Sequence, residues 1–456
     1  MSDPISLSIE FIDLKKFYKG KEQCHTSNIH YAHLYVNTDN IELKICLDDA
    51  PSLYVIIATW LYKLDFSKFG KNIKINLINN NLDDNLLKID FSDAKLLKIE
   101  HSDNILTFSI DTVKFYWNPN KEKVNTAEFY LDDKGFRIVE PFYSILTPKT
   151  WLKNDGNFNI GRMDNSNKFY KLGKSAFRPE FNLVAKDNRN NRVATITKGP
   201  KIQFKYQKGI TEDNAIFYGD VVLMLASFYH HIKIDYILRE IHLPESTITI
   251  KNAEKKNFLD RKGNLRGFGI NGGLKKFFEL SWQKETIKNY ALLSKTITLF
   301  NQSHLVDNSS AFLIRYNIIE ICDKQKQDNA KFTFVLDKER TKERQDEALE
   351  KLLETIDTNE HEDYKKRWQN VQTLLQNKPM KNQLVSFLES QNLDPKTFPV
   401  SIKHLKELRN NITHGSMDKV NPEQLRKSNI LLYRISGILI LNLMGIKDWK
   451  LDTDIK

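Results

Sequence analysis

The stretch LRNNITHG, residues 408–415, joins the end of one segment with helical spacing to the start of another. Its glycine is the residue that most often ends a helix, because glycine adopts the left-handed backbone conformation without strain. Just before that glycine the stretch carries Arg409, Asn410 and His414. Arginine is a permanent cation that can bind a phosphate through two parallel hydrogen bonds, and histidine is the side chain best suited to move a proton near neutral pH. The stretch therefore predicts a helix end that carries groups needed for phosphate chemistry.

Apolar residues recur at helical spacing from Leu274 onward, as in helices that bury one face. Asp307 or Asn308 is in position to cap the second of these helices. The segment 337–364 is rich in charged residues, so we expect a surface helix with many ion pairs four residues apart. An antiparallel helical bundle is the expected assembly. The predicted helices cover residues 283–301, 309–324, 337–364, 364–388, 401–413 and 422–444.

The first part of the chain has a different periodicity. Apolar and polar residues alternate in short segments, which is the pattern of strands with one buried face. Turn sequences such as DDKG, residues 132–135, separate these segments, and one helix is expected over about 214–232. The pattern predicts antiparallel sheets in a sandwich or partly closed barrel. The clearest alternating segments are residues 7–11, 41–45, 73–77, 106–110, 113–117 and 202–206.

The change of periodicity predicts two regions in an α+β chain. Residues 1–273 form the expected antiparallel β-rich region, either as one domain or as two subdomains split near residue 150. Residues 274–456 form the expected helical bundle. A chain of 456 residues is long enough for two or three domains of ordinary size.

A glycine-rich segment, residues 261–273, is the expected linker between these regions. It also contains the pattern GxGxxG at Gly267, Gly269 and Gly272. A dinucleotide-binding fingerprint needs a buried strand directly before it, and the preceding segment KKNFLD, residues 255–260, is not one. We therefore expect a hinge here rather than a nucleotide site.

The net charge and the cysteine content limit the classes of protein to which the chain can belong. The net charge of +11 favours an anionic partner, but no basic tail marks a dedicated nucleic-acid arm. None of the three cysteines (Cys24, Cys46 and Cys322) is part of a CxxC pair, so neither a disulfide framework nor a zinc site is expected. A reducing cytoplasm fits this cysteine usage best, and we expect no metal or other cofactor.

The sequence also predicts that the chain does not enter a membrane. The N-terminus carries no basic segment followed by an apolar one, as a secretory signal would. The longest apolar run, Ile430–Ile446, is short for a membrane span and is interrupted by Arg434 and Asn442. We therefore expect this run to form a buried helix.

Residues 408–415 carry what is needed to cleave RNA through attack by its own 2′-hydroxyl group. The reaction needs a group that moves a proton, a group that neutralises charge on the phosphate, and a site that holds the nucleotide in line. His414 can move the proton, Arg409 can bind the phosphate, and Asn410 can hydrogen-bond the phosphate or orient His414. No metal is required, because the nucleophile belongs to the substrate.

The spacing of these residues adds a geometric condition. Side chains five residues apart on an ideal helix point about 140° away from each other. Arg409 and His414 can converge within one chain if the helix loosens near Ile412 and Thr413. They can also converge across a dimer, where two copies meet at a shared cleft. The ordinary alternative is a surface arginine paired with a carboxylate, beside a histidine that caps a helix.

The stretch 408–415 resembles the RNxxxH signature of the HEPN superfamily, whose helical domains are named for higher eukaryotes and prokaryotes nucleotide-binding. The position of the signature, on the penultimate helix before a final apolar helix, is also similar. Glu320 resembles the acidic residue often found on the second helix of these bundles. The β-rich region in front, followed by a short linker, is similar to ApeA-type abortive-infection proteins.

This resemblance implies a metal-independent endoribonuclease that acts as a homodimer in the cytoplasm. Arg409, Asn410 and His414 of both subunits would line one catalytic cleft, and Glu320 would support it by orienting Arg409. It also implies an anti-phage defence role, in which a phage-derived trigger leads to cleavage of host RNA and arrest of growth. Because some HEPN proteins are inactive binders, the alternative is a non-catalytic RNA- or protein-binding dimer whose β-rich region recognises a ligand.

Overall fold

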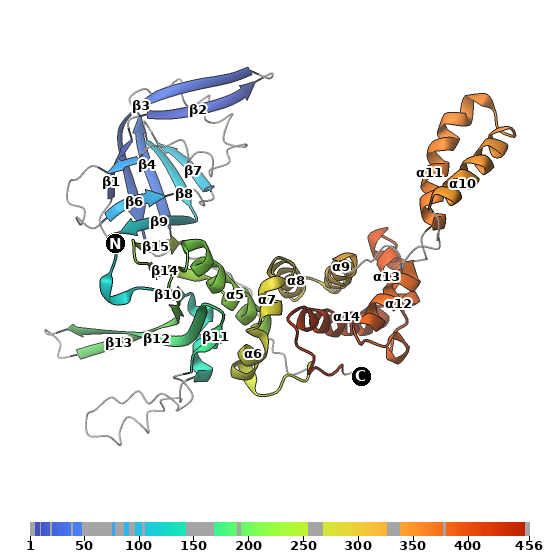
Figure 1. Ribbon diagram of the computed structural model, residues 1–456. Helices are drawn as coiled ribbons and strands as arrows, with labels where there is room; N and C mark the ends of the chain where they lie inside the picture. Colours follow the sequence, from blue (N-terminus) through green and yellow to red (C-terminus); the bar gives the residue numbers. More distant parts are fainter. Residues whose placement is uncertain are drawn as a thin grey trace. The chain divides into compact units, whose positions relative to one another are not determined.

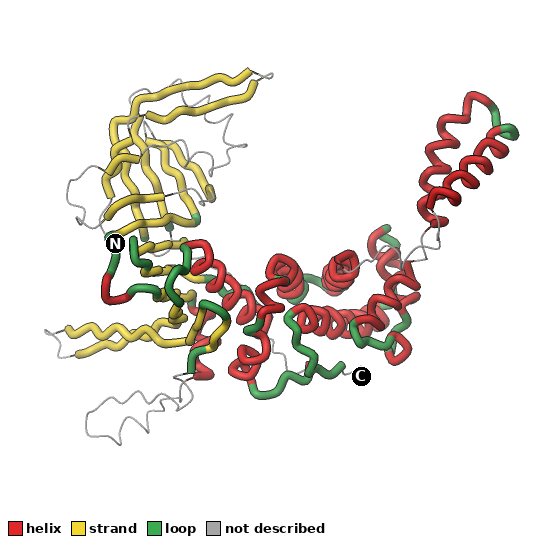
Figure 2. Tube along the Cα trace, in the orientation of Figure 1, coloured by secondary structure: helices red, strands yellow, loops and turns green. Residues whose placement is uncertain are grey.

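The computed structural model describes residues 5–9, 11–18, 21–37, 40–47, 75–77, 86–90, 96–102, 105–142, 168–188, 193–253, 268–325, 338–376 and 380–451. The chain divides into two compact units, one made of residues 1–260 and 272–284 and the other of residues 261–271 and 285–456. Among the described residues, the strands lie in the first unit and the second unit is helical (Figure 2). The α+β organisation expected from the sequence is therefore confirmed.

A seven-stranded antiparallel sheet forms the N-terminal part of the first unit (Figure 1). Its strands follow the order β5-β1-β3-β4-β8-β7, and β2 pairs with β3. Leu34, Leu43 and Phe108 are register neighbours across β3, β4 and β8, and all three are buried. The strand bounds are β1 Ile5–Ile9, β2 Phe11–Tyr18, β3 Lys21–Val36, β4 Ile41–Leu47, β5 Ile75–Leu77, β7 Leu96–Ser102 and β8 Ile105–Ile110.

A second, eight-stranded antiparallel sheet follows the order β11-β12-β13-β10-β14-β15-β9-β6. In its central strand β10, alternate residues Ala127, Phe129 and Leu131 are buried, as period-two patterning predicts. The strand bounds are β6 Leu86–Asp90, β9 Thr112–Trp117, β10 Thr126–Leu131, β11 Tyr170–Leu172, β12 Ser175–Asn188, β13 Val193–Tyr206, β14 Tyr236–His242 and β15 Thr247–Asn252.

The chain passes from the first sheet to the second at Asp111, between β8 and β9. The earlier strand β6 also belongs to the second sheet, so no single cut in the sequence separates the two. The subdomain split considered near residue 150 falls between 143 and 167, outside the described residues.

Helix α5, Glu212–His230, packs directly on β10. A Cβ atom placed on Gly219 would lie only 1.6 Å from Cε2 of Phe129, so glycine allows this close approach. Thr211 caps the helix by accepting a hydrogen bond from the backbone N–H of Asn214. Beneath the helix the guanidinium of Arg239 is paired with Asp220 and lies over the Tyr236 ring.

Helix α6, Gly273–Ser281, belongs to the first unit and not to the helical region in which the sequence pattern had placed it. Its aromatic residues provide the reason. The ring of Phe277 lies 5.4 Å from that of Tyr229 on α5, and the ring of Phe278 lies 5.1 Å from that of Phe177 on β12. Part of the expected linker, residues 261–267, lies outside the described residues.

Helix α14, Pro422–Leu443, is the buried helix of the second unit. It contacts α8, Tyr290–Gln302, and α9, Asn308–Gln325. The partly buried Arg315 on α9 donates to the backbone and side-chain oxygens of Asn429, each at 3.2 Å, and removal from solvent lowers its pKa to about 10. Across the part of the chain that the structure describes, none of the helices combines the length and apolar character of a membrane span.

Among the described residues, the remaining helices of the second unit follow the sequence pattern with one extra break and one shifted boundary. The segment expected as one helix over 283–301 breaks at Asn289, whose side-chain amide donates to the backbone oxygen of Leu443 at 2.7 Å. The boundary expected near residue 364 lies earlier in the chain, between α10 and α11, where Asp357 caps a new turn. Residues 377–379, between α11 and α12, lie outside the described residues. The expected cap at Asp307 is confirmed, since its carboxylate accepts the backbone N–H groups of Ser309 and Ser310. The bounds are α7 Lys284–Lys288, α10 Lys338–Leu353, α11 His361–Gln376, α12 Met380–Ser390 and α13 Ile402–Thr413.

Candidate functional site

Helix α13 carries the stretch singled out in the sequence. It begins after Ser401, whose hydroxyl oxygen accepts a hydrogen bond from the backbone N–H of His404 at 3.2 Å. Its buried stripe, Ile402, Leu405 and Leu408, faces the bundle, where α13 contacts α9 and α12. This packing fixes the helix and leaves Arg409, the next residue, partly exposed.

Arg409 on α13 is brought to Glu320 on α9. The Nη2 atom of Arg409 lies 3.8 Å from Oε1 of Glu320, and the two side chains are 38% and 26% exposed. At this distance the contact is an ion pair that is too long for a hydrogen bond. The guanidinium is therefore held near the carboxylate while part of it stays accessible to solvent.

The ion pair lies in a groove between α9 and α13 with a volume of about 310 Å³. The wall from α9 consists of Leu313, Ile314, Tyr316, Asn317 and Glu320, and Arg409 and Thr413 come from α13. Burial and the Glu320 carboxylate raise the pKa of Tyr316, while Arg409 lowers it. The phenol therefore stays protonated at neutral pH and supplies no negative charge to the groove.

His414 lies at the C-cap of α13, outside this groove. Its backbone N–H donates to the oxygen of Asn410 at 2.9 Å, so the helical hydrogen-bond pattern continues to His414. The turn then closes through Gly415, which has a φ of +72°, and through a bond from the Ser416 N–H to the oxygen of Asn411 at 2.8 Å. The His414 side chain is exposed.

The loosening of the helix considered near Ile412 and Thr413 is not present. The hydroxyl of Thr413 donates to the backbone oxygen of Arg409 at 2.7 Å, which adds a further bond to the last turn. Arg409 and His414 therefore keep the wide angular separation of residues five apart on a helix. Asn410 is partly exposed and is turned by about 100° from Arg409. Within one chain, the structure joins Arg409 to Glu320 but not to Asn410 or His414.

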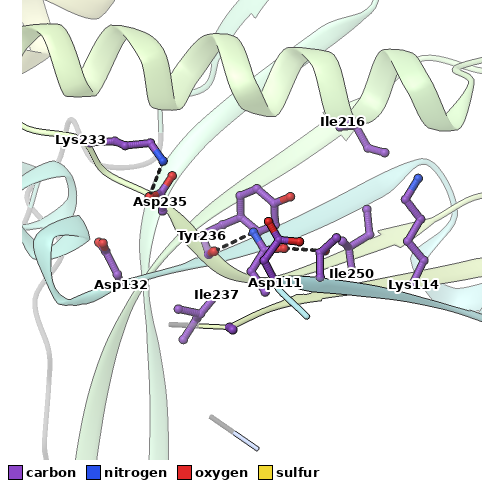
Figure 3. Close-up of a pocket in the computed structure, with 12 residues that line it drawn as sticks. Asp111, Lys114, Asp132, Ile216, Lys233, Asp235, Tyr236, Ile237 and Ile250 are labelled. Atoms are coloured by element: carbon purple, nitrogen blue, oxygen red, sulfur yellow. Dashed lines mark hydrogen bonds and ion pairs between the residues drawn. The ribbon is translucent and has the colours of Figure 1, made fainter. Parts of the chain in front are cut away.

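A second cavity, of about 270 Å³, lies within the first unit between α5 and the strands β9, β14 and β15 (Figure 3). Its wall includes the carboxylates of Asp111, Asp132 and Asp235, and the ring of Tyr236. The Nζ atom of Lys233 lies 2.8 Å from Oδ2 of Asp235. The cavity thus combines charged groups with an apolar wall.

Asp132 is the most perturbed carboxyl group of this cavity. Burial raises its pKa to about 6, with Asp235 adding to the shift and Lys134 opposing it. Its Oδ1 atom is buried and accepts no hydrogen bond from the described residues. The sequence did not reveal this cavity, because its residues come from separate segments of the chain.

A metal centre is not evident in the described part of the chain. No group of three or more histidine, cysteine, aspartate or glutamate side chains there is arranged to hold a metal ion. The most perturbed histidine, His230, has its pKa lowered to about 4 by burial, with Arg137 adding to the shift.

The chain matches no family model, no curated protein and no solved structure. The candidate site therefore rests on its own geometry, and the groove that holds Arg409 and Glu320 is the region where the sequence pattern and the structure coincide.

Proposed function

We propose that the chain is a metal-independent endoribonuclease of the HEPN type, which cleaves RNA through attack by the 2′-hydroxyl group. Arg409 binds the scissile phosphate and neutralises the charge that develops on it. His414 moves the proton to the leaving 5′-oxygen or from the 2′-hydroxyl. Asn410 hydrogen-bonds the phosphate or orients His414, and Glu320 holds Arg409 in place.

The ion pair between Arg409 and Glu320 carries this proposal. A guanidinium that is paired at 3.8 Å and is 38% exposed keeps hydrogen-bond donors for an incoming phosphate. A surface ion pair of this kind contributes at most about 1 kcal/mol to stability, so its benefit to the fold alone is small. The position of the pair in a groove of about 310 Å³ favours a role in binding.

The position of His414 favours a site shared by two copies. Arg409 and His414 diverge within one chain, but two helix ends related by twofold symmetry can bring the histidine of one copy near the arginine of the other. We therefore propose a homodimer as the active form. Cleavage of host RNA in the cytoplasm during phage infection, after a phage-derived trigger, is the biological role proposed for it.

The test is RNA cleavage by the purified chain in the presence of EDTA. We expect products with a 2′,3′-cyclic phosphate or 3′-phosphate and a 5′-hydroxyl group. His414→Ala and Arg409→Ala should each reduce the rate by about 100-fold or more while thermal unfolding stays unchanged. Arg426→Ala is the matched control, because Arg426 is exposed and lies 3.9 Å from Glu423. Cleavage that survives in both site variants would contradict the proposal.

The cavity near Asp132 favours a second candidate function, which is recognition of a ligand by the first unit in a non-catalytic dimer. This alternative expects binding of RNA or protein without turnover, and no effect of His414→Ala in cells. Expression in a bacterial host separates the two functions, since the ribonuclease should arrest growth only when His414 is present.

A further inference from the structure

One face of α9 supplies most of the groove beside Arg409. Leu313, Asn317 and Glu320 recur four and three residues apart, so they form a row along one face of the helix. Asn317 lies about 4.5 Å along the helix axis from Glu320, and Leu313 lies about 10 Å from it. Along α9 the groove therefore offers an apolar side chain, an amide and a carboxylate in sequence, and the carboxylate is paired with Arg409 of α13.

These surfaces suit the phosphate of a nucleotide and the face and edge of its base. A guanidinium binds phosphate. Apolar side chains such as Leu313 and Ile314 can pack against the face of a base that is turned out of its stack. An asparagine amide offers one acceptor and two donors, which suits the edge of a base.

The size and exposure of the groove also suit one nucleotide. Its volume of about 310 Å³ lies at the low end of small-molecule sites, which run from about 300 Å³ upward. Asn317 is exposed and lines the groove. An exposed amide in this position adds little to the core, so its side chain is available for a ligand.

We infer that Asn317 contacts the base of the nucleotide whose phosphate Arg409 binds, and that it sets the base preference at the cleaved bond. This inference rests on the proposed ribonuclease function. Asn317 moves no proton and is a specificity-determining residue, whereas Arg409 and His414 act on the phosphate.

The experiment uses the full-length protein and four short oligonucleotides. Each is a 2′-deoxy strand with a single ribonucleotide, so cleavage by 2′-hydroxyl attack is confined to one position, which carries A, C, G or U. The value of kcat/KM is measured on all four substrates for the wild type, for Asn317→Ala and for Gln302→Ala. Gln302 is the matched control, because it is an exposed amide on α8 and does not line the groove.

We expect the wild type and Gln302→Ala to discriminate about 10-fold or more between the best and worst base, as one amide contact to a base edge can provide. For Asn317→Ala the ratio of kcat/KM between the best and the worst base should fall to about 3-fold, mainly because kcat/KM for the best base falls. This variant should unfold at the wild-type temperature. If the wild type cleaves without base preference, or if Asn317→Ala keeps the wild-type preference, the inference is wrong and the ribonuclease function stands. If no His414-dependent cleavage of these substrates or of natural RNA occurs, both are wrong.

Discussion

Arg409 and Glu320 meet across α13 and α9, with Nη2 of Arg409 at 3.8 Å from Oε1 of Glu320. The carboxylate also influences its other neighbours, since it raises the pKa of Asp323 and of Tyr316, where burial is the larger cause in both cases. Glu320 is thus the electrostatic centre of the groove. Its function, in our proposal, is to hold the arginine in place until a phosphate binds.

Replacing Glu320 by glutamine should lower activity and leave the fold intact. The amide keeps the shape of the side chain but loses the charge that holds Arg409, so we expect kcat/KM for RNA to fall about 10-fold. The free energy of unfolding should change by less than about 1 kcal/mol, because the pair is partly exposed. Glu423→Gln is the control, since Glu423 also contacts an exposed arginine, at 3.9 Å. Wild-type activity in Glu320→Gln would argue against a positioning role.

The glycine that ends α13 should be needed for its backbone conformation alone. Gly415 has a φ of +72° and a Cβ atom there would meet nothing within 4 Å, so alanine at this position suffers strain without a clash. We expect Gly415→Ala to lower the free energy of unfolding by about 1–2 kcal/mol and to lower RNA cleavage, because it shifts the adjacent His414. Thermal unfolding measures the loss of stability, and the RNA cleavage assay measures the loss of activity.

Gly209→Ala provides the comparison for that variant. Gly209 has a φ of +77° and equally open surroundings, but it lies in the first unit. It should show a similar loss of stability with full activity per folded molecule. Equal activity loss in the two variants would mean that the effect at Gly415 is not local.

Because α5 lies so close to β10, one added methyl group on α5 should strongly lower the stability of the first unit. Gly219→Ala places a carbon atom 1.6 Å from the Phe129 ring, so the helix or the ring must move. We expect a loss of about 1–3 kcal/mol in the free energy of unfolding of the first unit, measured by denaturant titration. Gly199→Ala is the control, because the nearest atom there lies 3.9 Å away. A Gly219→Ala protein as stable as this control would show that α5 does not pack as described.

Asp132 should make stability depend on pH. Its pKa is about 6 in the folded chain, against an ordinary value of 3.8, so the folded state binds a proton more tightly than the unfolded state. Below about pH 4 the carboxyl group is protonated in the folded and the unfolded chain, so it does not lower the free energy of unfolding. The free energy of unfolding falls as the pH rises from about 4 to about 6. Asp132→Asn removes this destabilisation, so it should raise the free energy of unfolding by about 3 kcal/mol near pH 8 and have little effect near pH 4.

The exposed neighbour Asp133 supplies the control for this pH dependence. Thermal unfolding of Asp133→Asn should follow the wild type at both pH values. A stabilisation by Asp132→Asn that is equally large at both pH values would show that it does not come from ionisation.

Periodicity in the sequence predicted most of the fold, because it reports burial within one element. Where the structure describes them, the alternating segments form strands of two antiparallel sheets, and the last apolar run forms the buried α14. The misplaced elements depend on contacts between distant residues. Asn289 breaks a helix where it bonds Leu443, and α6 joins the first unit through Phe277 and Phe278. A local sequence pattern cannot predict either contact, because each joins residues that are far apart in the sequence.

The residues of the candidate site could be predicted from the sequence only in part, because the site also depends on contacts between distant residues. The motif gave Arg409 and the family resemblance gave Glu320, and the fold brings the two together from different helices. A loosening of the helix before His414 is excluded by the hydrogen bonds of its last turn. The cavity near Asp132 was missed, because chain segments distant in sequence build it.

The most direct test of the central proposal is complementation between two inactive variants. Arg409→Ala and His414→Ala chains, each with its own tag, are combined and the mixed dimers are isolated through both tags. A mixed dimer keeps one intact pair formed by the arginine of one copy and the histidine of the other, but no intact pair within a single chain. We predict that these dimers recover about half of the wild-type cleavage rate, since one of two symmetric pairs is restored. Mixed dimers as inactive as their parents, beside an active wild type, would contradict a site shared between copies.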